Sequence, residues 1–380
     1  MSGARVLLVY GYEPSGHSEA AFAIEEAGRK AGLSFCRLEI AADHHPAAGR
    51  AVARGYHALL RAAPGAWGSL YQGAWARSIL RAVRAAYLEL GGARRLREGV
   101  RRSGAQVVVC PQAAVAAVLC EARRRGELDI PVVSVLTDYD VHPFWADPPA
   151  DLLLAPDAAA CMELERLGVP SARLRATGIP VHPAFVSAPG GAEARRALGL
   201  PSAAPVVLLT GGGKGLGGLD QAAAALLAAC PRAQLLVLCG ANDRLRMTLS
   251  LRASDRLRVF GPQPAAMVAL LMAAADLHWG KPGGLSAAES LASGLPMILS
   301  VSLPGQEKAN ARHLIMLGAA LEAGGPQSSA QLIVRLINDP AALARLRAAA
   351  FAAGVPGSAS SAVAAISSLL FDRPRAFLLQ

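Results

Sequence analysis

The sequence predicts an α/β protein built from two doubly wound domains that face each other across a cleft. Three observations support this fold class. Short apolar runs alternate with helical patterns along almost the whole chain, which is typical of parallel sheets covered on both faces. The 380 residues suffice for two domains of ordinary size. Glycine-rich turns follow several of the apolar runs, at the end of the strands where such sheets bind ligands.

Twelve apolar runs are predicted to be strands, in two series of six. The first series comprises Arg5–Tyr10, Ser34–Ile40, Gln106–Cys110, Pro131–Leu136, Leu152–Ala155 and Arg173–Ala176. The second comprises Pro205–Thr210, Gln234–Cys239, Leu257–Phe260, Asp276–Trp279, Pro296–Val301 and Ala319–Glu322. Helical patterns lie between them, for example at Ser18–Ala31, Ala158–Leu167 and Leu219–Ala229.

The domain boundary is predicted at HPAFVSAPGG, residues 182–191, because its prolines and glycines are typical of a linker. We therefore expect a first domain over residues 1–184 and a second over residues 190–356. Residues 357–380 would form a last helix, at Ser358–Phe371, and a tail.

The composition excludes several classes of protein. With 53% hydrophobic residues and glycines without a period, the chain is neither disordered nor fibrous. The longest apolar run, Ala265–Ala275, is shorter than the roughly 20 residues of a membrane span. The start, MSGARVLLVY, is too short for a signal peptide and predicts a buried strand. The six cysteines lack metal spacing, so we expect free thiols and a cytoplasmic protein.

The positive charge is concentrated in one segment. The chain has a net charge of +10, and Arg50–Arg102, with eleven arginines against two acidic residues, carries +9 of it. Arginines mixed with aromatic residues at near-helical spacing favour a surface that lies on an anionic membrane. A solvated helical face and, less favoured, a nucleic-acid surface remain as alternatives. The aromatic residues are Tyr56, Trp67, Tyr71, Trp75 and Tyr87.

Three glycine-rich turns lead from a predicted strand into a predicted helix. They are Gly11–His17, Gly211–Gly218 and Gly280–Leu285. Such turns expose backbone N–H groups at the positive end of a helix and therefore suit phosphate. No turn has the P-loop pattern or a complete GxGxxG fingerprint. Two turns at one edge of the second sheet indicate a diphosphate site there.

The string GKPGGLSAAESLASGLPMILSVSLPGQEKANARHL, residues 280–314, resembles glycosyltransferase family 28. Within it, the resemblance is to plant monogalactosyldiacylglycerol synthase and bacterial processive diacylglycerol glucosyltransferases. VSVLTDYDVHPFW at 133–145, ATGIPVHPAF at 176–185 and PSGH at 14–17 match as well. The resemblance implies a GT-B fold, with two Rossmann-like domains. It implies an acceptor-binding first domain, a second domain that binds a UDP-sugar, and a last helix that crosses back to the first.

The resemblance also assigns donor-binding residues in the second domain. Glu289 would accept the ribose hydroxyls, and Gln306 with Glu307 would bind hydroxyls of the sugar, supported by Asn310. The diphosphate would lie on glycine turns, and the uracil beside the end of a strand. The residues for these two groups are Gly212, Gly213, Lys214, Gly283 and Gly284, and Phe260 with Gly261.

Two residues of the first domain are candidates for the catalytic base. His17 is predicted at a helix start, where an imidazole stays neutral and can take a proton. Asp138 is either the rival base or the partner that orients His17. Asp138 and Asp140 spell a DxD metal motif, but the donor phosphates are expected in the other domain, so we expect no metal and no cofactor. By the resemblance, Gly16, His142 and Trp145 lie on the acceptor side.

Two positions depart from the family pattern. Relatives carry several glycines before the histidine, whereas only Gly16 precedes His17 here. Relatives commonly carry arginine where this chain has His182, and Lys214 can compensate for that lost charge. Both changes concern the acceptor and the pH profile more than the reaction class.

The sequence therefore predicts an inverting UDP-sugar-dependent hexosyltransferase that forms β-glycosyl diacylglycerol at the inner face of the membrane. Its expected partners are a UDP-hexose, diacylglycerol and, through Arg50–Arg102, the membrane surface, but not nucleic acid. The alternatives are another lipid acceptor, such as a polyprenyl-linked saccharide or a carotenoid, and a UDP-sugar-binding regulator with reduced catalysis. A UDP-sugar epimerase is a weaker rival. Glucose, galactose and N-acetylglucosamine remain equally possible as the sugar.

Overall fold

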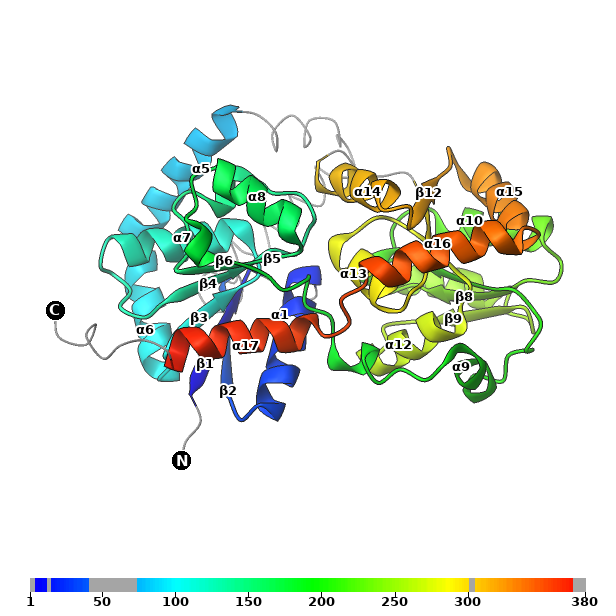
Figure 1. The fold of residues 1–380 in the computed structure, drawn as a ribbon, viewed down its shortest axis with the longest axis horizontal. Helices are drawn as coiled ribbons and strands as arrows, with labels where there is room; N and C mark the ends of the chain where they lie inside the picture. Colours follow the sequence, from blue (N-terminus) through cyan, green and yellow to red (C-terminus); the bar gives the residue numbers. More distant parts are fainter. Residues whose placement is uncertain (1–3, 12–14, 41–73, 301–304, 372–380) are drawn as a thin grey trace. The chain divides into compact units, whose positions relative to one another are not determined.

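The computed structural model describes residues 4–11, 15–40, 74–300 and 305–371. These residues form two compact units. One combines Met1–His182 with Gly357–Gln380, and the other is Pro183–Pro356 (Figure 1). Each unit has its own six-stranded sheet and hydrophobic core.

The sheet of the first unit is parallel throughout and has the strand order β2-β1-β3-β4-β5-β6. Its inner strands are apolar on both faces, because helices cover both sides of a parallel sheet. Along β1, Leu7 and Val9 face one helical layer while Val6 and Leu8 face the other. The strands are β1 (Arg5–Tyr10), β2 (Ser34–Glu39), β3 (Val107–Cys110), β4 (Val132–Val135), β5 (Leu152–Ala155) and β6 (Leu174–Ala176).

Helices cover the two faces of this sheet. On one face α6 and α7 pack against the sheet, and on the other α1 and the last helix of the chain, α17, lie side by side (Figure 1). The helices are α1 (Gly16–Lys30), α5 (Ala74–Tyr87), the π-helical turn η1 (Leu88–Gly92), α6 (Ala93–Ser103), α7 (Ala113–Arg124), α8 (Ala158–Arg166) and α17 (Ser358–Phe371), with short turns η2 (Pro143–Trp145) and η3 (Ser171–Arg173).

One stretch of the described residues, Pro340–Phe371, is long and apolar enough to be compared with a membrane span. It consists of two helices, because the helical hydrogen bonding stops at Gly354 and resumes at Ser358. The second of them, α17, buries Ala362, Val363 and Ile366 in the core of the first unit. Helix α17 thus packs with one face in the core of the first unit.

The second unit repeats the architecture, with the strand order β12-β11-β10-β7-β8-β9. Its strands are β7 (Val206–Thr210), β8 (Gln234–Leu238), β9 (Leu257–Phe260), β10 (Leu277–Gly280), β11 (Met297–Leu299) and β12 (Ala320–Glu322). Its helices are α9 (Gly191–Ala197), α10 (Leu219–Ala229), α11 (Asp243–Ser250), α12 (Ala265–Ala274), α13 (Gly284–Ala292), α14 (Gln306–Met316), α15 (Pro326–Ile337) and α16 (Pro340–Ala353), with short turns η4 (Pro183–Phe185) and η5 (Gly212–Lys214). All twelve predicted strands are present, with ends that differ from the prediction by one or two residues.

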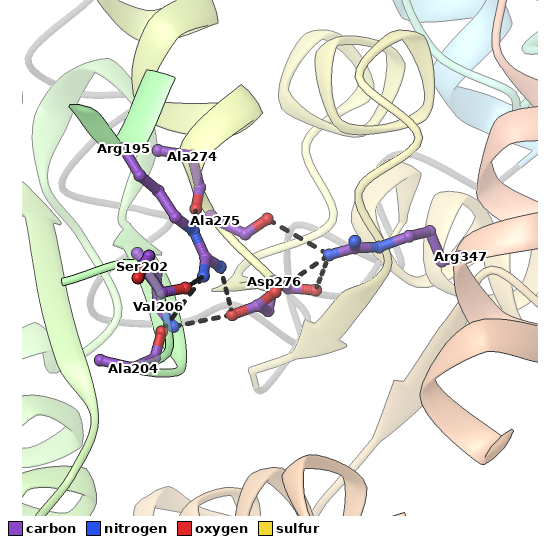
Figure 2. A network of polar contacts seen from close by, with 8 residues as sticks. All are labelled: Arg195, Ser202, Ala204, Val206, Ala274, Ala275, Asp276 and Arg347. Carbon is purple, nitrogen blue, oxygen red and sulfur yellow. Dashed lines mark hydrogen bonds and ion pairs between the residues drawn. The ribbon is translucent and has the colours of Figure 1, made fainter. Parts of the chain in front are cut away.

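The half-buried carboxylate of Asp276 connects several elements at the amino-terminal edge of the second sheet (Figure 2). Asp276, just before β10, accepts hydrogen bonds at Oδ2 from Arg195 Nη2 at 2.7 Å and from the backbone N–H of Val206 at 2.9 Å. Arg347 Nη2 contacts Oδ1 at 3.2 Å. The network thus ties β7 and β10 to α9 and α16 at the edge opposite the glycine turns, and its role is structural.

Candidate functional site

The carboxyl edge of the first sheet brings together residues from three strand ends. Gln112, after β3, accepts the backbone N–H of Gly11, after β1, at 2.8 Å. The Nδ1 atom of His17 lies 2.9 Å from Thr137 Oγ1, which follows β4. Thr137 Oγ1 in turn donates to the carbonyl of Pro111 at 3.4 Å. Because β1, β3 and β4 are neighbours in the sheet, these residues meet although they are far apart in sequence.

His17 lies in the first turn of α1, as the sequence predicts. Ser15 caps this helix: its hydroxyl accepts the N–H of Ser18, whose own hydroxyl accepts the N–H of Ser15. Gly16 is exposed beside it. Desolvation lowers the pKa of His17 to about 4, against a smaller opposite effect of the Pro111 carbonyl. The imidazole is therefore neutral near pH 7, the state that a general base requires.

The segment after β4 holds the other predicted residues of the first unit. Asp138 is half-buried there, next in the chain to Thr137. His142 is buried, accepts the N–H of Phe144 at Nδ1, and packs against the Phe144 ring with centroids 3.9 Å apart. Trp145 packs into the hydrophobic core with 7% of its surface exposed. His142 and Trp145 are thus both buried and hold the loop against the core.

Helix α5 is attached to the same loop by two arginines. Arg84 Nη1 donates to the carbonyl of Asp147 at 2.6 Å, and Arg81 Nε donates to the Asp147 carboxylate at 2.6 Å. Arg84 also faces Glu121, whose pKa is lowered to about 2, chiefly by its hydrogen bond with Arg124. Arg84 is buried, so it cannot belong to the basic outer surface predicted for Arg50–Arg102. The prediction of a basic outer surface is therefore wrong for Arg84, because its charge is buried and paired with Glu121.

The structure describes only some of the other arginines of the basic segment. Residues 50–73 lie outside the described part of the chain. In α6, Arg94, Arg97 and Arg101 are exposed, whereas Ala93 and Leu96 are buried against the sheet. The three arginines are three or four positions apart and so share one face of the helix.

In the second unit, three neighbouring strands end in glycine-capped helices. Gly218, Gly283 and Gly305 are the N-caps of α10, α13 and α14, and none supplies a side-chain hydrogen bond to its helix. These helices follow β7, β10 and β11, which are adjacent in the sheet. Three helix starts with glycine N-caps therefore lie at one sheet edge, and their N–H groups and dipoles favour a bound anion.

The turn after β7 is held tightly by the end of β8. The carbonyl of Gly213 accepts the N–H of Ala241 at 2.8 Å, and the carbonyl of Gly215 accepts Asn242 Nδ2 at 3.1 Å. A Cβ on Gly240 would lie 2.4 Å from the Gly213 oxygen, so only glycine allows this close approach. The carbonyls of the turn thus point toward β8. Gly213 is exposed and Lys214 is half-buried.

Lys281 is a site residue that the sequence analysis did not select. Its Nζ lies 2.6 Å from Glu307 Oε1 at the start of α14, and its Cε would lie 3.1 Å from a Cβ on Gly212. The side chain therefore spans from the turn after β10 to both neighbouring turns. The only signal in the sequence was its place in the string GKPGG, between glycines.

The residues assigned to the sugar and ribose lie in α14 and α13, the helices that follow β11 and β10. Gln306 and Glu307 are half-buried in the first turn of α14, and Asn310 is fully buried, with Nδ2 donating to the carbonyl of Pro282 at 3.1 Å. Glu289 is half-buried in α13. Gly283 and Gly284 begin that helix.

A buried histidine fixes α13 to the sheet. His278 Nε2 lies 2.8 Å from Thr210 Oγ1, at the end of β7, and its Nδ1 lies 2.6 Å from Ser290 Oγ in α13. Desolvation lowers the pKa of His278 to about 4, so it is neutral near pH 7. The residue next to Glu289 is thus anchored to the strand that carries the first glycine turn.

Phe260 and Gly261 lie farther along the same edge. Phe260 ends β9 and is half-buried, and Gly261 contacts the Arg246 side chain, whose Cδ would lie 3.2 Å from a Cβ there. Strand β9 is two strands from β7, which corresponds to about 10 Å at the usual strand spacing. The structure therefore separates these two residues from the glycine turns by a distance that a nucleotide can span.

Metal ligands are not clustered in the part of the chain that the structure describes: no group of three His, Cys, Asp or Glu side chains there could hold a metal ion. The six cysteines are all free thiols.

His182, where relatives commonly have arginine, is half-buried, and its pKa is lowered mainly by desolvation.

Comparison with known proteins confirms the resemblance. The family model described as monogalactosyldiacylglycerol (MGDG) synthase matches residues 17–181. A probable MGDG synthase 2 of Oryza sativa subsp. indica is 32% identical over 216 residues, which cover 54% of this chain and 46% of the relative. A processive diacylglycerol beta-glucosyltransferase of Staphylococcus carnosus is 29% identical over 220 residues, covering 58% of this chain and 56% of the relative. The matched region thus spans about half the length of these curated relatives.

The fold is also found among solved structures. A Staphylococcus aureus MnaA structure with UDP superimposes with a TM-score of 0.63 at 14% identity, over 97% of each chain. At this identity the likeness concerns the fold alone. Two doubly wound units with parallel sheets are the GT-B fold, as the sequence predicted.

Proposed function

We propose that this chain, a homologue of the monogalactosyldiacylglycerol synthases and processive diacylglycerol glucosyltransferases, transfers a hexose from a UDP-sugar to diacylglycerol. The product would be a β-glycosyl diacylglycerol, formed with inversion and without a metal or other cofactor. The first unit would bind the lipid acceptor and the second the nucleotide donor. The observation that carries this proposal is the edge of the second sheet, where three helices start at glycine N-caps and Lys281 contacts the first turn of one of them.

This edge has the chemistry that a departing nucleoside diphosphate needs. Each helix start contributes about half a positive charge, and its first N–H groups point out of the helix, toward the place where a bound anion would lie. Lys214 lies in the turn that holds Gly212 and Gly213 and adds a cationic side chain there, and Lys281 adds a second one that is ion-paired with Glu307. Positive charge that is already in place stabilises the diphosphate as its negative charge develops, which removes the need for a metal ion.

The remaining donor contacts follow from the positions of the polar side chains. Glu289 would accept the ribose hydroxyls, while Gln306 and Glu307 would bind hydroxyls of the hexose. Because Lys281 holds Glu307 by an ion pair of 2.6 Å, the carboxylate is oriented before the sugar arrives. Asn310, buried and bonded to the Pro282 carbonyl, would keep α14 in register with the turn after β10.

The chemical step uses a base of the first unit. The acceptor hydroxyl gives its proton to the imidazole of His17, and its oxygen attacks the anomeric carbon from the face opposite the diphosphate. The bond from that carbon to the diphosphate oxygen breaks with its electron pair, and UDP leaves. One attack from the far face inverts the configuration, so an α-linked donor yields a β-linked product. Asp138 is the alternative base.

A transfer assay with mixed lipids tests this function. We expect hexose transfer from one of UDP-glucose, UDP-galactose or UDP-N-acetylglucosamine to diacylglycerol, identified by mass spectrometry of the lipid product. A β-anomeric proton in the product spectrum would establish inversion, and activity in excess EDTA would establish metal independence. Transfer to another lipid alcohol, such as a polyprenyl-linked saccharide or a carotenoid, would replace diacylglycerol as the acceptor. UDP binding without turnover would favour the regulator, and an altered free UDP-sugar would favour an epimerase.

We further propose that the protein binds peripherally to the inner, cytoplasmic face of the membrane through its basic segment. On α6, Arg94, Arg97 and Arg101 present three charges on one exposed face. An arginine near an anionic bilayer contributes about 1 kcal/mol of binding free energy. The diacylglycerol acceptor lies in the membrane, so docking would bring the first unit to its substrate.

Replacing Arg94, Arg97 and Arg101 together by serine is expected to release the protein from anionic vesicles. The loss of about 3 kcal/mol corresponds to a roughly hundredfold lower partition coefficient in a sedimentation assay. The matched control replaces Arg196, Arg244 and Arg252 by serine, because these are exposed arginines of the second unit and the change in net charge is the same. Equal binding by the two variants would reject α6 as the docking face.

A further inference from the structure

We propose that Thr137 is a positioning residue that sets the tautomer of His17, so that the Nε2 atom of the imidazole takes the proton from the acceptor hydroxyl. The proposal rests on the proposed function only for the identity of the proton donor. The tautomer itself is a property of the unliganded first unit.

The geometry restricts where the protons lie. Thr137 Oγ1 is placed between two partners, His17 Nδ1 at 2.9 Å and the carbonyl oxygen of Pro111 at 3.4 Å. A carbonyl oxygen can only accept a hydrogen bond, and a hydroxyl has one proton to donate. When Thr137 donates to Pro111, its oxygen must accept from the imidazole. The Nδ1 atom of His17 then carries the hydrogen, and Nε2 is left with a lone pair.

The neutral state of His17 makes the tautomer decisive. Desolvation holds the pKa of His17 near 4, so near pH 7 one ring nitrogen carries a hydrogen and the other does not. A hydrogen bond between the ring and the Pro111 carbonyl raises the pKa against this effect, so that carbonyl also favours a hydrogen on the ring. An imidazole with its hydrogen on Nε2 would present a donor to the acceptor hydroxyl, and it could not accept the proton.

The position of Thr137 in the fold supports a role in orientation. Its side chain is buried, with 4% of the residue exposed, so water does not compete for the hydrogen bond. It follows β4, Pro111 follows β3, and His17 follows the turn after β1. The bond between Gln112 and Gly11 ties two of these three strand ends together independently of Thr137. The ring of His17 is therefore held from the sheet and not from its own helix.

Nitrogen NMR of protein labelled with ¹⁵N-histidine tests the tautomer without any substrate. The His17 signals are assigned by their absence from His17→Asn, and His278, bonded at both nitrogens, provides an internal reference. We expect the Nδ1–H form in the wild type and in Thr137→Ser. Thr137→Val, which keeps the shape but lacks the hydroxyl, should shift His17 toward the Nε2–H form. An Nε2–H form in the wild type, or an unchanged tautomer in Thr137→Val, overturns the proposal.

Kinetics then test whether the tautomer matters for transfer. Thr137→Val should lower kcat about three- to tenfold, the effect of one hydrogen bond between neutral groups, with an unchanged KM for the UDP-sugar. Thr137→Ser should restore kcat. In a His17→Asn background, Thr137→Val should cause no further loss, because its effect passes through the imidazole. An additional loss there would mean that Thr137 acts only on the fold. Absence of any transferase activity would refute the proposed function and leave the NMR result to decide the tautomer.

Discussion

Glu289→Ala is expected to weaken UDP binding strongly. The Glu289 carboxylate would accept two ribose hydroxyls, and hydrogen bonds to a charged group contribute about 1.5–3 kcal/mol each. Losing both weakens binding by roughly a hundredfold or more, which titration calorimetry with UDP measures directly. Helix α13 should stay in place in the variant, because Ser290 is held through His278 to Thr210.

The control for this experiment is Glu193→Ala, which removes an exposed carboxylate in the first turn of α9 in the same unit. Its UDP affinity should equal that of the wild type. Thermal unfolding of both variants separates a lost contact from a damaged fold. An unchanged UDP affinity in Glu289→Ala would reject the assignment of the donor site to the α13 edge.

His17→Ala should have the largest effect on catalysis. A general base contributes about 10²–10⁴-fold to the rate, so kcat should fall by that factor. UDP affinity should not change, because the residues proposed to bind the donor lie in the other unit. Asp138→Asn is the companion variant. If kcat persists in His17→Ala and falls in Asp138→Asn by the expected factor, Asp138 is the base.

The pH dependence provides a second readout of His17. Its pKa is lowered from 6.5 to about 4, so the imidazole loses its lone pair only when the pH falls through about 4. The acid limb of kcat/KM should therefore lie near pH 4 and not near 6.5. The same shift affects stability: the unfolded chain binds the proton first, so the free energy of unfolding decreases as the pH falls from 6.5 toward 4. An acid limb near 6.5 would contradict a desolvated base.

Much of the fold could be predicted because its signals are local. Each strand is a short apolar run between turn residues, so a few consecutive residues suffice to recognise it, as in VVVC at β3. The glycine turns were equally readable, since the need for glycine at a turn such as Gly215, with φ of +56°, is set by the backbone of a few residues. The proposed donor residues were selected from the glycine turns and the PGQE string, and their role stays a prediction.

Other features depend on which strand ends become neighbours. Arg84 belongs to a basic segment by sequence, yet burial beside Glu121 removes it from the surface. Lys281 had no predicted role until the sheet order set it against Glu307. The sequence proposed Asp138 as either the rival base or the partner of His17. It did not point to Thr137, whose Oγ1 the structure places at the Nδ1 atom of His17, 120 residues away along the chain.

By itself, the sequence determined the order of strands and helices, the helix starts that suit a diphosphate and the family resemblance. Only the tertiary structure decided the partner of each charged or titratable side chain. The physical reason is the sequence separation over which each interaction acts. Periodicity and turn chemistry act over a few residues, whereas a hydrogen bond or a desolvated imidazole depends on atoms that chain crossovers bring together from distant segments.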